Sequence, residues 1–191
     1  MSALPPDLQD VARFAYLSGW RKGQVQTLGW PDVDRGAGRI VLRREHSKNG
    51  EPRVLPLLGD LAALIERRWT AREYQTAGGT SALSRFVFHR HGEPVSDFRK
   101  VWESACKTAG VSGTLFHDLR RSAVRNMDRA GVSQTVAMAL IGQKTASVYR
   151  RYRIDDENDL REALERTQAS VAARPRGTVT PICEGAHCTG R

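Results

Sequence analysis

The amino-acid sequence predicts an α+β protein that is predominantly α-helical and carries a small antiparallel β-sheet. Apolar residues recur at helical spacing along most of the chain, first over residues 7–18. Two runs rich in branched residues, RIVLRR at 39–44 and PRVLPL at 52–57, are typical of strands, and the polar segment between them predicts a hairpin with Lys48 near its tip. The length of 191 residues fits one domain of ordinary size, so we expect no second full domain.

The other elements before residue 110 follow from periodicity and turn residues. The helix at 7–18 ends at Gly19, and a second at 22–28 stops at the Trp30-Pro31 turn, which puts Arg21 at a helix junction. The patterns further predict a helix at 59–76, a short strand at 85–89 and a helix at 95–109.

Three short helices and one long helix are predicted after residue 110. The short ones occupy 117–130, 133–140 and 145–151, with glycines after the first two. A charged helix follows at 156–173. Residues 174–191 have no periodicity, and we expect a disordered tail there.

The charge balance favours a polyanionic partner. Lys plus Arg number 30 against 21 Asp plus Glu, a net charge of +9, which makes nucleic acid the leading candidate. No apolar run approaches the roughly 20 residues of a membrane span, and the amino terminus lacks the regions of a signal peptide. We therefore expect a soluble cytoplasmic protein with no membrane partner.

The cysteines and histidines give little support for a metal site. Cys183, His187 and Cys188 offer three ligands without a second pair, and Cys106 is isolated. His89 and His91 flank an arginine before a turn, and we interpret them as loop or phosphate-facing residues. We expect neither a metal nor another cofactor.

Cleavage of a phosphodiester without a metal needs a particular set of groups. Cations must stabilise the charge of the transition state, a nucleophile must attack in line, and an acid must protonate the leaving oxygen. Arginine binds two phosphate oxygens at once and stays charged. The sequence carries such groups in the segments SGWRKGQ (Arg21), SKNGEPRVLPL (Lys48), FHDLRRSAVRNM (His117, Arg120) and IGQKTASVYRRY (Tyr149, Tyr152).

No single one of these residues is decisive, because a lone arginine is usually a solvated surface residue. Their joint order resembles the catalytic domain of tyrosine recombinases and phage integrases over roughly residues 7–160. SGWRKGQVQTLGWPDVD resembles that family's first-arginine segment, HDLRRSAVRNMDRAGV its His-x-x-Arg segment, and GQKTASVYRRYRI its Gly-His through Tyr segment. The resemblance implies the DNA breaking-rejoining fold for residues 1–173.

The resemblance also implies roles for four residues. Arg21 and Arg120 would clamp the scissile phosphate. Lys48 would be the general acid toward the 5′ oxygen. His117 would hydrogen-bond the phosphate or accept the tyrosine proton.

The carboxy-terminal part of the pattern implies the nucleophile and contains a departure. The nucleophile would be Tyr152, with Tyr149 as an alternative that we interpret as a packing residue. Gln143 stands where the family has histidine or tryptophan, and Gln24 replaces the usual acidic residue. Glutamine can donate a hydrogen bond to a phosphate but cannot exchange a proton.

The resemblance implies a recombinase that cleaves and rejoins double-stranded DNA through a 3′-phosphotyrosyl intermediate and acts as a homo-tetramer. It also implies a bacterial or phage-encoded protein associated with the nucleoid. Residues 156–173 are the candidate subunit contact, and Arg99, Lys100 and Lys107 could face DNA. Few residues precede the first helix, so the family's amino-terminal DNA-clasping domain is expected to be absent. The alternatives are a catalytically weakened DNA-binding module, favoured by the two glutamines, and a type IB topoisomerase.

Overall fold

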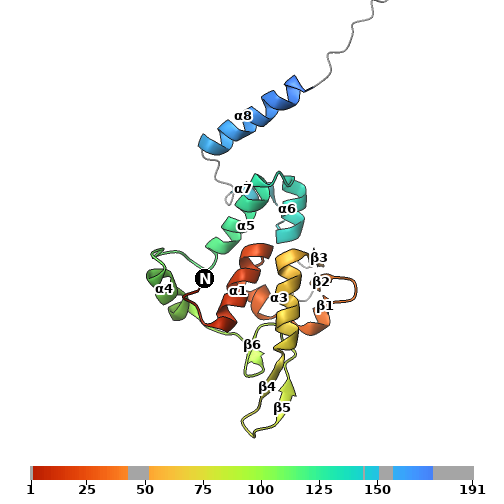
Figure 1. Cartoon of the computed structure of the whole chain (residues 1–191), viewed down its shortest axis with the longest axis vertical. Helices are drawn as coiled ribbons and strands as arrows, with labels where there is room; N and C mark the ends of the chain where they lie inside the picture. The colour runs from red at the N-terminus through yellow and green to blue at the C-terminus, as the bar shows by residue number, and fades with distance from the viewer. Residues whose placement is uncertain (1, 43–51, 144, 151–156, 174–191) are drawn as a thin grey trace, which may run out of the picture. The chain divides into compact units, whose positions relative to one another are not determined.

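A computed structural model describes residues 2–42, 52–143, 145–150 and 157–173, and the chain divides into two compact units. The first unit is Met1–Ile154 and the second is Asp155–Arg191. The first contains the elements from α1 to α7 (Figure 1), and the second contains α8.

The first three helices along the chain are α1 (Pro6–Ser18), α2 (Lys22–Gln26) and α3 (Gly59–Thr70). α1 begins with a proline, which a first helical turn tolerates because its N–H groups lack helical partners. α1 packs against α3 and α5 (Asp118–Arg129), as Figure 1 shows, and its buried face includes Leu8, Val11 and Phe14. The predicted helices at 7–18 and 22–28 are confirmed to within two residues.

A short 3-10 turn, η1 (Trp30–Asp32), leads into an antiparallel three-stranded sheet in the order β1 (Val33–Asp34), β2 (Arg39–Leu42) and β3 (Arg53–Pro56). Ile40 pairs with Leu55, and both side chains are buried, so this face of the sheet contributes to the core. The predicted antiparallel strand pair is confirmed. Lys48, at the predicted hairpin tip, lies outside the described residues.

Four helices complete the first unit: α4 (Arg99–Thr108), α5 (Asp118–Arg129), α6 (Gln134–Ile141) and α7 (Ala146–Arg150). Val124, Ala137, Ile141 and Tyr149 form an apolar cluster that joins α5, α6 and α7. The larger core cluster extends from α1 through the sheet to α4. In Figure 1, α6 and α7 lie at the opposite end of the unit from the β4–β5 hairpin.

The segment between α3 and α4 differs from the prediction. The helix predicted at 59–76 ends at Thr70, and Glu73–Gln75 instead forms β4, which pairs with β5 (Ser81–Leu83). The strand predicted at 85–89 is wrong for most of its length. Apart from an isolated bridge between Phe86 and Gly29, the pairing there is that of β6 (His89–Arg90) with β7 (Glu93–Pro94). Val87 and Phe88 are both buried although they are neighbours, which breaks the alternation of a strand.

The helix predicted at 95–109 begins four residues later than expected. The side chain of Gln26 donates to the carbonyl oxygens of Val95 and Ser96 at 2.6 and 2.7 Å, which holds these residues in a loop beside α2. Tertiary hydrogen bonds therefore override the local helical pattern at this position.

The second unit contains one described helix, α8 (Glu157–Ala172). Leu160, Leu164 and Val171 recur at helical spacing on it and are 64%, 60% and 62% exposed. Within the described ranges, no helix combines the length and the apolar character that crossing a membrane requires.

Candidate functional site

Arg21 is placed by a tight junction between α1 and α2. Gly19 adopts φ 66°, and a Cβ atom there would lie 2.8 Å from a methyl group of Ile141, so the turn can pack directly on α6 only with glycine. Trp20 is fully buried, edge-on to Phe14 at 5.6 Å between ring centroids. The anchored tryptophan leaves Arg21, which is half-buried, at the start of α2.

Arg120 is a buried charged residue that joins three segments of the chain. It lies in the first turn of α5, and only 1% of its surface is exposed. Its Nη1 donates to the carbonyl oxygens of Gly19 and Ile141, the second at 2.8 Å. Because Gly19 is two residues before Arg21, these hydrogen bonds hold Arg120 close to the segment that carries Arg21.

His117 is the exposed residue that precedes α5. The pKa of His117 is lowered, first by the burial of part of its ring and then by the charges of Arg120, Arg121 and Arg21; Asp118 opposes this shift. The ring is therefore neutral at pH 7. Arg21 is among the charges that act on this ring.

Gln143 lies at the corner that follows α6. Gly142 ends the helix with φ 68°, and the backbone N–H of Gln143 donates to the carbonyl of Met138 at 3.0 Å. This corner is next to Ile141, whose carbonyl oxygen accepts from Arg120. The described residues thus place Arg21, His117, Arg120 and the Gln143 backbone around the junction of α1, α5 and α6.

Gln24 takes part in holding this junction. It is buried, and its Oε1 accepts from the backbone N–H of Arg21 at 3.3 Å, which satisfies a donor at the start of α2. Its Nε2 is buried without a hydrogen-bond partner among the described residues. Gln24 therefore supplies the acceptor that a carboxylate would offer, but without a negative charge.

Sequence reasoning missed Arg53 on β3, the strand that follows the predicted hairpin tip. Its guanidinium carbon lies 5.3 Å from the ring centroid of Trp20, and the guanidinium also lies against the backbone of Gly142. Burial, and then the charge of Arg21, lowers the pKa of Arg53 to about 10, so it stays protonated at pH 7. An arginine in a strand pattern gives no sequence signal of such burial.

The two candidate nucleophiles have different outcomes. Tyr149 is 1% exposed within the cluster formed by α5, α6 and α7, which agrees with its interpretation as a packing residue. Tyr152, like Lys48, lies outside the described residues, so its role remains a prediction.

The basic residues of α4 are partly neutralised. Arg99 forms an ion pair with Glu103 at 2.8 Å, one helical turn away. Lys100 and Lys107 are exposed. Two of the three positive charges predicted to face DNA are therefore accessible without breaking this ion pair.

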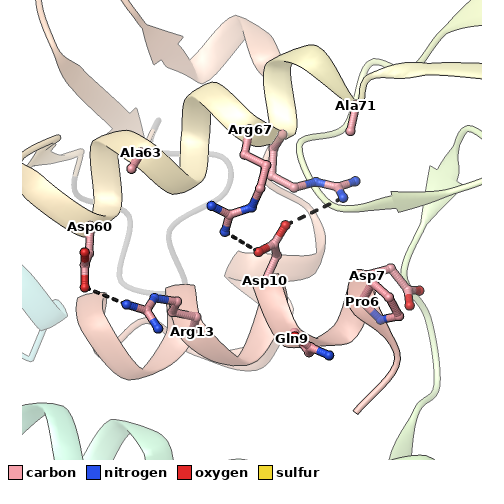
Figure 2. A pocket seen from close by; sticks show the side chains of 10 residues that line it. Pro6, Asp7, Gln9, Asp10, Arg13, Asp60, Ala63, Arg67 and Ala71 are labelled. Atoms are coloured by element: carbon pink, nitrogen blue, oxygen red, sulfur yellow. Dashed lines mark hydrogen bonds and ion pairs between the residues drawn. The ribbon is translucent and has the colours of Figure 1, made fainter. Parts of the chain in front are cut away.

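A pocket of about 530 Å³ lies between α1 and α3, and its charged groups pair with one another. Figure 2 shows Asp10 facing Arg67 and Arg13 facing Asp60. The Asp10 carboxylate lies 2.5 Å from Arg67 and 3.8 Å from Arg68. Since these charges are already matched, we assign this pocket a structural role.

The interpretation of His89 as a loop or phosphate-facing residue is wrong. His89 is buried; its Nε2 lies 3.1 Å from the carbonyl oxygen of Ala71, and its Nδ1 accepts from the N–H of Gly92 at 3.3 Å. One ring nitrogen contacts the residue that follows α3, and the other accepts within the β6–β7 hairpin, so His89 is structural. The part of the chain that the structure describes holds no cluster of three His, Cys, Asp or Glu suited to a metal, and Cys183, His187 and Cys188 fall outside it.

The fold is that of a tyrosine recombinase catalytic domain, because solved structures of such domains are similar to this chain. The chain is similar to a Tn1549 transposon integrase in complex with a circular intermediate DNA (TM-score 0.65, 17% identity, 82% of this chain and 57% of that chain). It is also similar to a lambda integrase dimer bound to a COC′ core site (TM-score 0.63, 22% identity, 80% of this chain and 54% of that chain).

The sequence profile of the phage integrase family matches residues 4–159, and the chain belongs to this family. It is 27% identical over 156 residues to the tyrosine recombinase XerC of Roseiflexus castenholzii, covering 79% of this chain and 49% of the relative. It is 24% identical over 156 residues to the integrase of Salmonella phage P22, covering 76% of this chain and 38% of the relative. The chain thus spans half or less of the length of these relatives.

Proposed function

We propose that this chain is the catalytic domain of a site-specific recombinase that cleaves and rejoins double-stranded DNA through a 3′-phosphotyrosyl intermediate. The observation that carries the proposal is the junction of α1, α5 and α6, where Arg21, His117 and Arg120 gather although Arg120 and Gly19 are 101 residues apart. Membership of the phage integrase family supports the same function.

In the proposed cleavage, the hydroxyl oxygen of Tyr152 attacks the scissile phosphorus. The new bond joins phosphorus to the tyrosine oxygen, and the bond from phosphorus to the 5′ oxygen breaks. Arg21 and Arg120 stabilise the charge on the phosphate oxygens, and Lys48 protonates the leaving 5′ oxygen. His117, neutral at pH 7, hydrogen-bonds the phosphate or accepts the tyrosine proton. Rejoining reverses these steps, because the covalent linkage conserves the bond energy.

A catalytically weakened DNA-binding module is the second candidate, and the two glutamines favour it. Gln143 cannot exchange a proton, and Gln24 contributes no charge beside Arg21. Such a protein would bind DNA through phosphates, with steep salt dependence, but would not form the covalent intermediate.

Covalent trapping separates the two candidates. The full chain is incubated with labelled, nicked duplex DNA from the flanks of its own gene, and SDS-resistant adducts are measured for wild type, Tyr152→Phe and Tyr149→Phe. We expect an adduct that only Tyr152→Phe abolishes, because Tyr149 is buried in the helical cluster. Tyr149→Phe is the matched control, since it removes the same hydroxyl group three residues away.

The other outcomes are distinct. Salt-sensitive DNA binding without an adduct favours the weakened module. If Gln143→His then forms an adduct, the glutamine at position 143 accounts for the missing cleavage activity. Relaxation of a supercoiled plasmid without any sequence requirement would instead favour a type IB topoisomerase.

Assembly into a homo-tetramer on DNA forms part of the proposal, with α8 as the subunit contact. The support is the exposed apolar stripe of Leu160, Leu164 and Val171, since exposed stripes of this kind mark interaction sites. Crosslinking on cognate DNA should recover species larger than monomers. Recovery of monomers alone would contradict the assembly without affecting the proposed chemistry.

A further inference from the structure

Arg53 is a buried cation without a counter-ion among the described residues. Its Nε, Nη1 and Nη2 atoms are all buried, and none has a hydrogen-bond partner in the described part of the chain. No described carboxylate forms an ion pair with it, and the neighbouring charge that acts on it is the positive charge of Arg21. Buried guanidinium groups normally have acceptors, so the described residues alone do not complete the surroundings of the Arg53 guanidinium.

The segment around Arg21 carries further buried donors that lack hydrogen-bond partners among the described residues. Trp20 Nε1 and Gln24 Nε2 are also buried and lack partners among the described residues. These two residues flank Arg21 in the sequence, and the Trp20 ring lies beside Arg53. A group of donors and two positive charges favours one class of ligand, an anion with several acceptor oxygens.

The position of Arg53 is fixed by packing. Its guanidinium lies against Gly142, where a Cβ atom would overlap it, and β3 contacts α6 at this point. Gly142 immediately precedes Gln143, and Ile141 before it accepts a hydrogen bond from Arg120. The Arg53 charge is therefore held at the same junction as the other candidate site residues.

We propose that Arg53 and Arg21 form an anion-binding pair whose charge is neutralised by a DNA phosphate, so that Arg53 is a further phosphate-binding residue of this site. This inference rests on the proposed function, because it takes the anion to be a phosphate of bound DNA. In the free protein the two like charges repel in a poorly solvated place, which makes the empty site costly to the fold. Bound phosphate removes that repulsion.

The test compares the full-length chain with Arg53→Met, which keeps much of the side-chain volume and removes the charge. Without ligand, we expect Arg53→Met to raise the melting temperature, because a buried unpaired cation is lost. Inorganic phosphate at constant ionic strength should raise the melting temperature of wild type, and this shift should disappear in Arg53→Met. Arg53→Lys should retain part of the shift, since the charge remains.

A second measurement uses duplex DNA. The slope of log Kd against log salt concentration should fall by about one in Arg53→Met, the change expected for one lost phosphate contact. Arg39→Met is the matched control: Arg39 lies on β2, at the opposite end of the β2–β3 register, and pairs with Asp34 at 3.5 Å. It should leave both the phosphate shift and the salt slope unchanged.

Several outcomes would overturn the inference. A lower melting temperature or failure to fold in Arg53→Met would assign Arg53 a structural role, as would an unchanged phosphate shift and salt slope. Absence of a phosphate shift in wild type would rule out the anion site. Phosphate could raise the melting temperature only of proteins that keep a positive charge at position 53, while covalent trapping yields no adduct. In that case the anion-binding pair stands and the proposed catalysis fails.

Discussion

At the scale of single residues, His117 should couple DNA binding to pH. Its pKa is lowered in the free protein by partial burial and by neighbouring arginines, so the ring is neutral at pH 7. A DNA phosphate nearby would favour the protonated ring and raise this pKa, so the complex takes up a proton that the free protein does not hold. Affinity for duplex DNA should therefore increase as the pH falls below 7, by at most about tenfold per pH unit.

His117→Gln tests this coupling, because glutamine keeps a hydrogen-bond donor and does not titrate. The pH dependence of Kd, measured by fluorescence anisotropy between pH 8 and about pH 6, the range in which histidine titrates, should flatten in this variant. His89→Gln is the control: burial also lowers the pKa of His89, but that ring is held by the backbone of Ala71 and Gly92. Equal pH dependence in wild type and His117→Gln would exclude the coupling.

Arg120 should contribute to stability as well as to phosphate binding. Arg120→Ala leaves the carbonyl oxygens of Gly19 and Ile141 without this donor and opens a cavity in the junction. With about 1.5–3 kcal/mol for each hydrogen bond from a charged group, the free energy of unfolding should fall by at least about 3 kcal/mol. Arg121→Ala, which removes an exposed ion pair with Asp118, should cost at most about 1 kcal/mol. Similar urea-unfolding midpoints for the two variants would contradict this assignment.

The site was predictable from the sequence to the extent that its residues lie in ordered motifs. Arg21, His117 and Arg120 fall in segments whose spacing and order carry the prediction, and the structure brings them to one junction. Arg53 was not predictable, because its burial depends on contact with Gly142, 89 positions later in the chain. A charged residue in a strand has the same local pattern whether it faces solvent or the end of a distant helix.

At the scale of elements, the fold prediction failed where contacts between residues far apart in the sequence decide the local structure. Helices whose ends coincide with glycine, such as α1 and α6, were predicted closely because glycine adopts the left-handed conformation that stops a helix. The errors concentrate between α3 and α4. There Phe86 bridges to Gly29, and Val95 and Ser96 accept hydrogen bonds from Gln26, so the partners lie 57 to 70 residues earlier in the chain.

The end of α6 offers a test in which two glycines are compared. Gly131 and Gly142 follow helices with φ 74° and 68°, but a Cβ atom at 131 meets nothing within 4 Å, whereas one at 142 meets the Arg53 guanidinium. Gly131→Ala should therefore cost only the strain of the left-handed conformation, about 1–2 kcal/mol. Gly142→Ala should lower the free energy of unfolding, measured with urea, by more than Gly131→Ala does. It should also weaken DNA binding, since Arg53 must move. Equal losses of stability with unchanged binding would show that the Arg53 contact has no consequence.

At the scale of the whole molecule, the two units should be separable. A chain ended after residue 156 retains the first unit, Met1–Ile154, and lacks α8, whose leucines at 160 and 164 are exposed. Because exposed side chains contribute little to folding, the melting temperature should change by less than about 2 °C, which corresponds to under 1 kcal/mol for a domain of this size. Calorimetry measures this change, and crosslinking on DNA measures assembly, which should be lost.

The full-length double substitution Leu160→Glu/Leu164→Glu distinguishes the apolar stripe from the remainder of the removed segment. It keeps the chain length and should reproduce the loss of assembly, with an unchanged melting temperature. If the shortened chain melts at a much lower temperature while the double substitution does not, residues after 156 stabilise the first unit through contacts other than the stripe. Loss of assembly only in the shortened chain would move the subunit contact away from the leucines of α8.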